Sequence, residues 1–440
     1  MRWRGSYAWL RSERILTHNL IVGGGTIAAG VLGVAFQALI SHRLRPVDYG
    51  AVFAVVTMIT LIGLPASALT LLMARETSRD RANGQRPQSA ALLRTGNRAL
   101  LLGGLAFAAL FALAAPLLAR FFDVPLPLLW AAAAGMPFGL ALPLLLGAFQ
   151  GEQQFLTFAV LSTGQAGLKL LAALALAIAY GPLGIIAGIS LATALVYVVA
   201  LWMLRRKLSI RPRLPWLRPA ATYLAVIVPS TLALAVLLSS DVLLVKHFFT
   251  SRAAGEYAAV AAIGRAIFWG ATGVASVLFP KMIYRESQGS SGSPLFTASM
   301  ALVVIGGLAG LGFLSFGSTW LLIAFAGNAY ADAAQYLPWY AIGMTLLGGV
   351  AVLIATYQSR GAPGFLAVLL PLTLLEPATL LVFHASLTQV IVAVDISIAA
   401  VLIALGSLYW WQERARIAVS THDEALGSTS SYFAQAEVNR

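Results

Sequence analysis

The chain has 440 residues, of which 59% are hydrophobic and only 10% are charged. Soluble domains are about 45–50% apolar and about 25% charged, so a fold surrounded by water could not cover this much apolar surface. The composition therefore excludes a cytosolic enzyme, a secreted domain and a disordered scaffold. Lipid is the predicted solvent for most of the chain, which carries 29 Lys and Arg against 16 Asp and Glu.

Long apolar runs dominate the sequence. A run of about 20 residues crosses about 30 Å of hydrocarbon as a helix. The runs lack the alternation of membrane strands, and open sheet edges cannot exist in lipid. The sequence therefore predicts an all-α, polytopic membrane protein with about 12 transmembrane helices. The predicted spans are 19–41, 50–73, 99–119, 125–149, 155–179, 182–204, 219–240, 255–279, 295–323, 333–356, 363–383 and 388–410.

The positive charges fall mainly on one side of the predicted membrane. With a cytoplasmic N-terminus, 22 of the 29 Lys and Arg lie in cytoplasmic segments and five lie in outer loops. Short cytoplasmic loops of membrane proteins carry such an excess of cations. We therefore predict that both termini are cytoplasmic. This asymmetry explains the net charge of +13 without nucleic acid as a partner, and membrane lipids are the expected partners of the basic loops.

A basic segment near the middle divides the chain into two sets of six predicted spans. Weak self-similarity relates the sets: HRLRPVDYG at 42–50 has a counterpart in HFFTSRAAGEY at 247–257. Both sets begin on the same side, so we predict two lobes related by a parallel internal repeat. The alternative is that short membrane loops converge on Gly, Tyr and Arg by chance. The predicted parts are a cytoplasmic N-terminal segment (1–18), an N-lobe (19–204), a basic linker (205–218), a C-lobe (219–410) and a cytoplasmic tail (411–440).

Two cations lie deep within the predicted spans. A charge near the middle of a bilayer costs ~2.5 kcal/mol or more, so such residues usually face a cavity or a partner. Lys169 is fourteen residues into its span, and Arg265 is ten residues into its span. We predict that both line a cavity and bind an anionic substrate. The alternative is a structural ion pair between Lys169 and Glu376, or between Arg265 and either of them.

Carboxylates at membrane depth are the candidates for ion coupling. Glu376 and Asp395 lie inside the last two predicted spans, and Asp241 lies at the end of the seventh predicted span. A titratable carboxylate in a membrane cavity can bind H⁺ or Na⁺ and so couple transport to an ion gradient. Asp241 and Lys246 are also consistent with residues at the outer surface whose side chains reach water.

Three amides are candidates for a polar cavity, namely Gln37, Gln165 and Asn19. Their side chains could bind sugar hydroxyls, although intramembrane amides more often tie helices together. The sequence contains no nucleophile elbow, Walker loop or zinc-protease motif. It has no cysteine, and its five histidines show no ligand spacing. We therefore expect no catalytic residues, no metal site and no cofactor, and a transporter that uses at most an H⁺ or Na⁺ gradient.

Several segments carry a resemblance to a known family. They are HNLIVGGGTIAAG, SHRLRPVDYGAVFAV, SSDVLLVKHFFTSRAAGEYAAVAAIGRAIF, VLFPKMIYRES and YGPLGIIAGISLATALVYVVALWMLRRKL. In this order and spacing, over about residues 15–410, the chain resembles the polysaccharide (lipid-linked oligosaccharide) flippase family of the multidrug/oligosaccharidyl-lipid/polysaccharide exporter superfamily.

The resemblance implies a two-lobed, V-shaped exporter in the bacterial cytoplasmic (inner) membrane. Such a flippase moves a polyprenyl-pyrophosphate-linked oligosaccharide to the outer leaflet by alternating access, for polysaccharide biosynthesis such as that of an exopolysaccharide. Arg265 and Lys169 fit the family's cavity cations that bind the pyrophosphate, and other polysaccharide assembly proteins are expected partners. The alternatives are an ion-coupled multidrug exporter of the same superfamily, or a membrane polymerase or accessory protein of polysaccharide assembly.

Overall fold

The computed structural model describes residues 15–82, 87–208, 218–287, 293–361 and 363–438. Every regular element within these ranges is a helix, and no strand occurs there. Twelve of the described segments are long and apolar enough to cross a membrane, and they coincide with the twelve predicted runs. The predicted all-α class is therefore confirmed, and the twelve apolar helices indicate a multi-pass membrane protein. Most of the predicted N-terminal segment and basic linker lies outside the described residues.

The described residues of the first half form seven helices, and prolines start or interrupt several of them. Pro46 opens one helix, where the N–H that proline lacks is not needed. Pro65 ends the same helix one residue later, so the predicted span 50–73 is divided. The helices are α2 (Ile15–Arg43), α3 (Pro46–Ala66), α4 (Ala68–Ala82), α5 (Pro87–Phe121), α6 (Leu126–Gly151), α7 (Phe155–Tyr180) and α8 (Pro182–Leu208).

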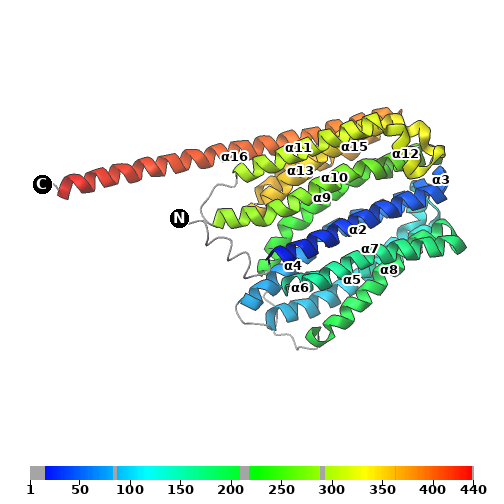
Figure 1. Ribbon diagram of the computed structural model, residues 1–440, viewed down its shortest axis with the longest axis horizontal. Coiled ribbons are helices and arrows are strands. Elements are labelled where there is room, and N and C mark those ends of the chain that lie inside the picture. Colours follow the sequence, from blue (N-terminus) through cyan, green and yellow to red (C-terminus); the bar gives the residue numbers. More distant parts are fainter. Residues whose placement is uncertain (1–14, 83–86, 209–217, 288–292, 362, 439–440) are drawn as a thin grey trace.

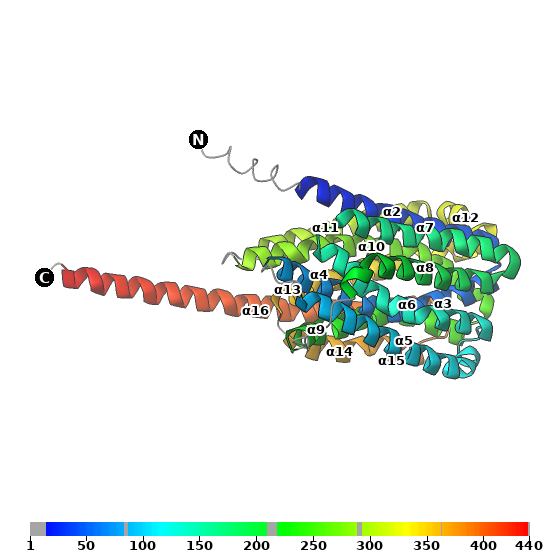
Figure 2. The ribbon, with the colours of Figure 1, turned by 90° about the horizontal axis from the view of Figure 1, so that it is seen from below.

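The second half departs from the predicted spans at three places. The span 295–323 is divided near Gly317, and the span 363–383 is divided near Leu374. The last helix continues beyond residue 410 and projects from the bundle, so the predicted tail is helical up to Val438 (Figure 2). The elements are α9 (Arg218–Phe248), α10 (Ser251–Ser287), α11 (Ser293–Phe316), α12 (Ser318–Ala326), η1 (Asn328–Tyr336), α13 (Leu337–Arg360), η2 (Pro363–Phe365), α14 (Leu366–Thr373), α15 (Leu375–Val382) and α16 (Leu387–Val438).

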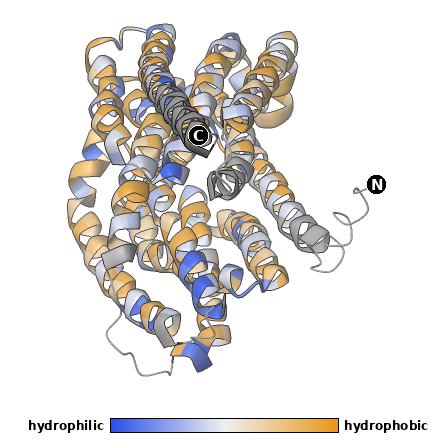
Figure 3. Cartoon of the chain, turned by 90° about the vertical axis from the view of Figure 1, so that its left-hand side faces the viewer, coloured by the Kyte–Doolittle hydropathy of each residue, from blue (hydrophilic) through white to orange (hydrophobic). Residues whose placement is uncertain are grey.

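The helices of each half pack mainly on one another. In Figure 1 the helices α9–α16 lie above the helices α2–α8, with the long axes nearly parallel. The halves meet where α3 packs on α9 and α10, with smaller contacts from α4 to α9 and from α2 to α12. Hydrophobic residues cover most of the outer flanks of the helices (Figure 3), as expected of surfaces that face acyl chains.

The closest approach between the halves uses two glycines. A Cβ added to Gly50 of α3 would lie 2.9 Å from the backbone nitrogen of Gly255 of α10, and a Cβ on Gly255 would overlap the Pro46 carbonyl. Both glycines belong to the segments that the sequence pairs as a repeat. The contact therefore depends on two absent side chains, because any Cβ here meets rigid backbone.

Replacing Gly255 by alanine is expected to destabilise the contact between α3 and α10. Overpacking against backbone costs about 1–3 kcal/mol, so the melting temperature of the purified protein in detergent is expected to fall. Gly103→Ala on α5 is the control, because a Cβ there meets nothing within 4 Å. Equal melting temperatures for the two variants would contradict this account of the interface.

Candidate functional site: a cationic cavity between the two halves

A cavity of about 500 Å³ lies between α2, α3 and α7 of the first half and α9 and α10 of the second. Both predicted cations, Lys169 and Arg265, line this central cavity, and so does Gln37. Trp269, which is 47% exposed, also belongs to its lining, so the cavity is not sealed inside the protein. The two charges that the sequence singles out by depth thus meet in one place, although they come from different halves.

Arg265 is held by a dense set of partners. Its residue is only 7% exposed, and its Nη2 forms an ion pair with Asp241 at 3.1 Å. Nη2 also donates to the backbone carbonyl of Leu238, and Nε donates to the Tyr340 hydroxyl at 3.3 Å. From the first half, the Thr57 hydroxyl accepts a long hydrogen bond from Nη1 at 3.5 Å. The guanidinium is therefore fixed in direction, because its rigid fork of donors is largely occupied.

Asp241 is the acceptor at the centre of this arrangement. Tyr257 and Tyr340 donate to its Oδ2 at 3.1 and 2.9 Å, while Oδ1 faces Arg265. Asp241 is 0% exposed, which corrects the expectation that it lies at the outer surface. A buried carboxylate is tolerated only with such partners, because an unpaired charge in a low-dielectric interior is very costly.

Lys169 differs from Arg265 because no acidic side chain pairs with it in the described part of the chain. Its Nζ lies 4.6 Å from the centre of the Phe36 ring, a cation–π contact between α7 and α2. The alternative ion pair between Lys169 and Glu376 is not formed, nor does either residue pair with Arg265. Lys169 is therefore the cation of the central cavity whose charge is available to a ligand.

Glu376 and Asp395 lie in the second half, away from the lining of the central cavity. Glu376 is fully buried, and neither of its carboxylate oxygens has a hydrogen bond of normal geometry among the described residues. It interacts electrostatically with Asp241, Arg265 and Asp395. Oδ1 of Asp395 also lacks a hydrogen-bond partner within those ranges and lies against Gly343, where any Cβ would overlap it.

The other predicted polar residues are dispersed. Gln37 lines the central cavity and accepts a long hydrogen bond from Tyr49 at 3.4 Å. Gln165 reaches Thr193 at 3.5 Å, so it links α7 to α8 and is not in the cavity lining. The side chain of Asn19 lies outside the described residues.

A polar contact joins the halves near the ends of α5 and α9. Lys246, only 2% exposed, pairs with Asp123 of the first half at 3.1 Å and donates to Ser251 at 3.0 Å. Ser251 also donates to Asp123, and the His247 ring stacks on Phe121 with centroids 3.8 Å apart. These five residues are called the outer contact below. Lys246 is thus a buried partner of Asp123, which corrects the expectation that its side chain reaches water.

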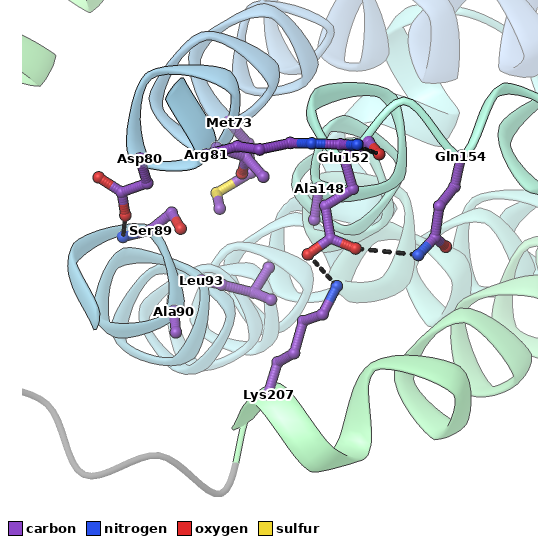
Figure 4. Close-up of a pocket in the computed structure, with 11 residues that line it drawn as sticks. Met73, Asp80, Arg81, Ser89, Ala90, Leu93, Ala148, Glu152, Gln154 and Lys207 are labelled. Carbon is purple, nitrogen blue, oxygen red and sulfur yellow. Dashed lines mark hydrogen bonds and ion pairs between the residues drawn. The ribbon is translucent and has the colours of Figure 1, made fainter. Parts of the chain in front are cut away.

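A second cavity, of about 580 Å³, lies between α4, α5, α6 and α8 (Figure 4). Its cations have partners within the first half: Lys207 pairs with the Glu152 carboxylate, and Arg81 donates to the Glu152 backbone carbonyl. Gln154 donates to the same carboxylate at 3.0 Å. This cavity holds helix ends together, and it is the weaker candidate because its ionic groups are paired.

The residues that sequence reasoning missed are those that hold Arg265 in place. Tyr257 and Tyr340 lie within apolar helices, and Thr57 comes from α3. A signal was available for the tyrosines, since a phenol buried in an apolar helix needs a hydrogen-bond partner. The partner of each tyrosine is set by helix packing. Tyr340 and Asp241, for example, are 99 residues apart in the sequence, and the local sequence pattern does not show that they meet.

Comparisons with known proteins establish the fold. The sequence matches no family model and no curated protein. The structure is similar to an inward-facing multidrug resistance MATE family transporter of the MOP superfamily, with a TM-score of 0.68 and 13% identity over 89% of this chain and 95% of that chain. It is also similar to the lipid II flippase MurJ in an inward closed conformation, with a TM-score of 0.67 and 12% identity over 88% and 86% of the two chains. The chain therefore has the fold shared by MATE transporters and MurJ.

The outer contact is expected to weaken in acid. The Ser251 hydroxyl and the Lys246 ammonium donate to Asp123 and hold the pKa of its carboxyl below the usual range. Because the pKa is lower in the folded state, the stabilisation is present above the unfolded pKa of about 3.9 and is lost as the pH falls through the folded value.

The melting temperature of the parent protein is therefore expected to fall between about pH 4 and pH 2 more steeply than that of Asp123→Asn. The control is Asp332→Asn in η1, because Asp332 takes no part in the outer contact. An acid profile for Asp123→Asn that is identical to the parent's would contradict the assignment.

Proposed function

We propose that the protein is a flippase that translocates a polyprenyl-pyrophosphate-linked oligosaccharide across the bacterial cytoplasmic membrane by alternating access, for polysaccharide biosynthesis. The single observation that carries the proposal is the presence of Lys169 and Arg265 in one cavity between the two halves. The fold shared with MATE transporters and with the lipid II flippase MurJ supports a transporter, and both termini are proposed to be cytoplasmic.

The cavity solves the physical problem that such a substrate poses. A pyrophosphate and its sugar hydroxyls cannot cross about 30 Å of hydrocarbon, because burying unpaired polar and charged groups costs far more than thermal energy. Lys169, which has no acidic partner among the described residues, offers an ammonium group to phosphate oxygens inside the membrane. Arg265 lines the same space, but most of its donors are occupied by Asp241 and its other partners. Gln37 supplies an amide in the same lining for a sugar hydroxyl.

Alternating access requires contacts between the halves that can be made and broken. The outer contact joins loops that the charge pattern assigns to the outer side, and its partners come from different halves. We propose that it closes the cavity toward the outside and separates when the substrate is released. Other polysaccharide assembly proteins are then the proposed partners that supply and accept the substrate.

Ion coupling is proposed for the carboxylates of the second half. Glu376 is buried without a normal hydrogen bond among the described residues, and the charges of Asp241, Arg265 and Asp395 act on it. Binding of H⁺ or Na⁺ at Glu376, with Asp395 nearby, would change the electrostatic balance around the pair of Arg265 with Asp241. An ion gradient could thereby alter how firmly Arg265 is held at the cavity.

The rival function is export of cationic drugs, for which the MATE neighbours provide precedent. The positive charge of Lys169 has no acidic partner among the described residues and would repel a cation in this cavity, and this observation favours an anionic substrate. A polymerase or an accessory protein would not translocate a lipid-linked oligosaccharide after purification. Translocation of a fluorescent lipid-linked oligosaccharide by the protein in vesicles therefore separates the proposed function from both alternatives.

Lys169→Gln is expected to reduce this translocation strongly. The variant keeps a polar side chain, one atom shorter, but removes a charged hydrogen bond worth about 1.5–3 kcal/mol, which corresponds to about 10–150-fold in affinity. The matched control is Arg120→Gln at the exposed end of α5. Unchanged translocation by a folded Lys169→Gln protein would contradict the proposed pyrophosphate site, whereas gain of drug export in vesicles would favour the rival function.

Glu376→Gln is expected to separate transport from the ion gradient. Glutamine imitates the neutral carboxyl in shape, so the variant is expected to translocate at one rate with or without an imposed H⁺ or Na⁺ gradient. Asp395→Asn tests whether the second carboxylate is needed for the same response. A gradient response in Glu376→Gln equal to that of the parent would rule Glu376 out as the coupling residue.

A further inference from the structure

An apolar groove adjoins the central cavity. It encloses about 630 Å³ between α10, α11 and α12, with one residue from α2, and every residue that lines it is apolar. Leu302 and Phe313 of α11, which are mostly exposed, lie at its edge. Along α11 the lining extends from Leu302 to Leu314, which is about 18 Å at 1.5 Å per residue.

The groove and the central cavity share part of their lining. Four residues line both of them, namely Val34 of α2 and Ala262, Ala266 and Gly270 of α10. This segment of α10 therefore borders the central cavity, which is lined by Lys169 and Arg265. It also borders the apolar groove, which is lined by no polar side chain. A single molecule that occupied both spaces would need an anionic end and a long apolar end.

The groove exists because side chains are missing from its walls. A Cβ added to Gly270 or Gly306 would meet nothing within 4 Å, so these positions border open space. Small residues elsewhere in membrane helices bring backbones together, as Gly307 does against Thr345 of α13. Gly270 and Gly306 make no such contact, so close helix packing does not explain them.

We propose that the apolar groove binds the isoprenoid chain of the substrate while its pyrophosphate lies against Lys169 and Arg265. The inference rests on the proposed function and deepens it, because it places the first several isoprene units on the protein. The chain is already surrounded by acyl chains of similar polarity, so the groove would add affinity through van der Waals packing, and its shape would select the chain. Phospholipids share the anionic-head and apolar-chain chemistry, so the test must distinguish them.

The test uses the full-length protein in lipid nanodiscs and measures equilibrium binding of two radiolabelled probes, farnesyl pyrophosphate and isopentenyl pyrophosphate. They carry the same head and differ in chain length. A Cβ at Gly306 meets nothing within 4 Å, so Gly306→Leu places its side chain in the groove without a clash at the backbone, and Gly312→Leu is the matched control. Gly312 lies on the same helix, also borders open space, and lines neither the groove nor the cavity.

Gly306→Leu is expected to weaken binding of farnesyl pyrophosphate by about tenfold, since the new side chain occupies volume in which the isoprenoid chain would otherwise make packing contacts. Binding of isopentenyl pyrophosphate is expected to stay unchanged, and Gly312→Leu is expected to change neither. Partition of the longer probe into the nanodisc is the same for all variants, so the difference between the two leucine variants reports on the groove. Lys169→Gln is expected to weaken both probes.

Equal affinities for farnesyl pyrophosphate in Gly306→Leu and Gly312→Leu would overturn the proposal. Displacement of farnesyl pyrophosphate by an equal concentration of phosphatidylglycerol would also overturn it, because the groove would then be a general lipid site. The binding test requires no transport. A parent protein that shows the expected binding but translocates no lipid-linked oligosaccharide would refute the proposed function while leaving the chain-binding groove supported.

Discussion

The pairing of Arg265 with Asp241 is the interaction on which the site depends. An isolated charge in the interior of a membrane protein is very unfavourable, and the two tyrosines and the Leu238 carbonyl complete the partners that make the pair tolerable. Asp241 comes from α9 and Arg265 from α10, while Thr57 extends the network to α3 of the first half. The network thus orients a cation at a cavity and also joins the helices that form its wall.

The two cations of the central cavity have different surroundings: Arg265 is held in place by several partners, whereas Lys169 has an ammonium group that remains available. Arg265 is fixed by a full set of partners and keeps its direction when the cavity is empty, which is preorganisation. Lys169, in contrast, has the Phe36 ring beside its ammonium group and no acidic partner among the described residues. In the proposed flippase, the flexible stem of lysine would allow its charge to follow a phosphate, whereas the direction of the arginine is set by its protein partners.

The twelve spans were predictable because lipid imposes a length and a composition on any segment that crosses it. The depth of Lys169 and Arg265 in their spans was equally informative. The buried position of Asp241 could not be predicted in the same way. The apolar run stops at this first charge, so the predicted span was ended there. In the structure α9 continues for seven residues to Phe248, about 10 Å further, because a paired Asp241 can remain at membrane depth. The partners of charged residues are set by three-dimensional packing, which a single sequence does not reveal.

The pair of Lys246 with Asp123 is unequal in its exposure, and this has a consequence for the energetics of opening. The lysine side chain is 2% exposed and the aspartate 74% exposed, so dissolved ions reach only one of the two charges. Counter-ions can screen Asp123, but they cannot replace it beside an ammonium group that is shut away from solvent. In the proposed opening, Lys246 would lose this partner while still shielded from solvent, which is unfavourable. Water that then reached its ammonium group would offset part of that loss, so the cost of opening depends on how early this one nitrogen becomes hydrated.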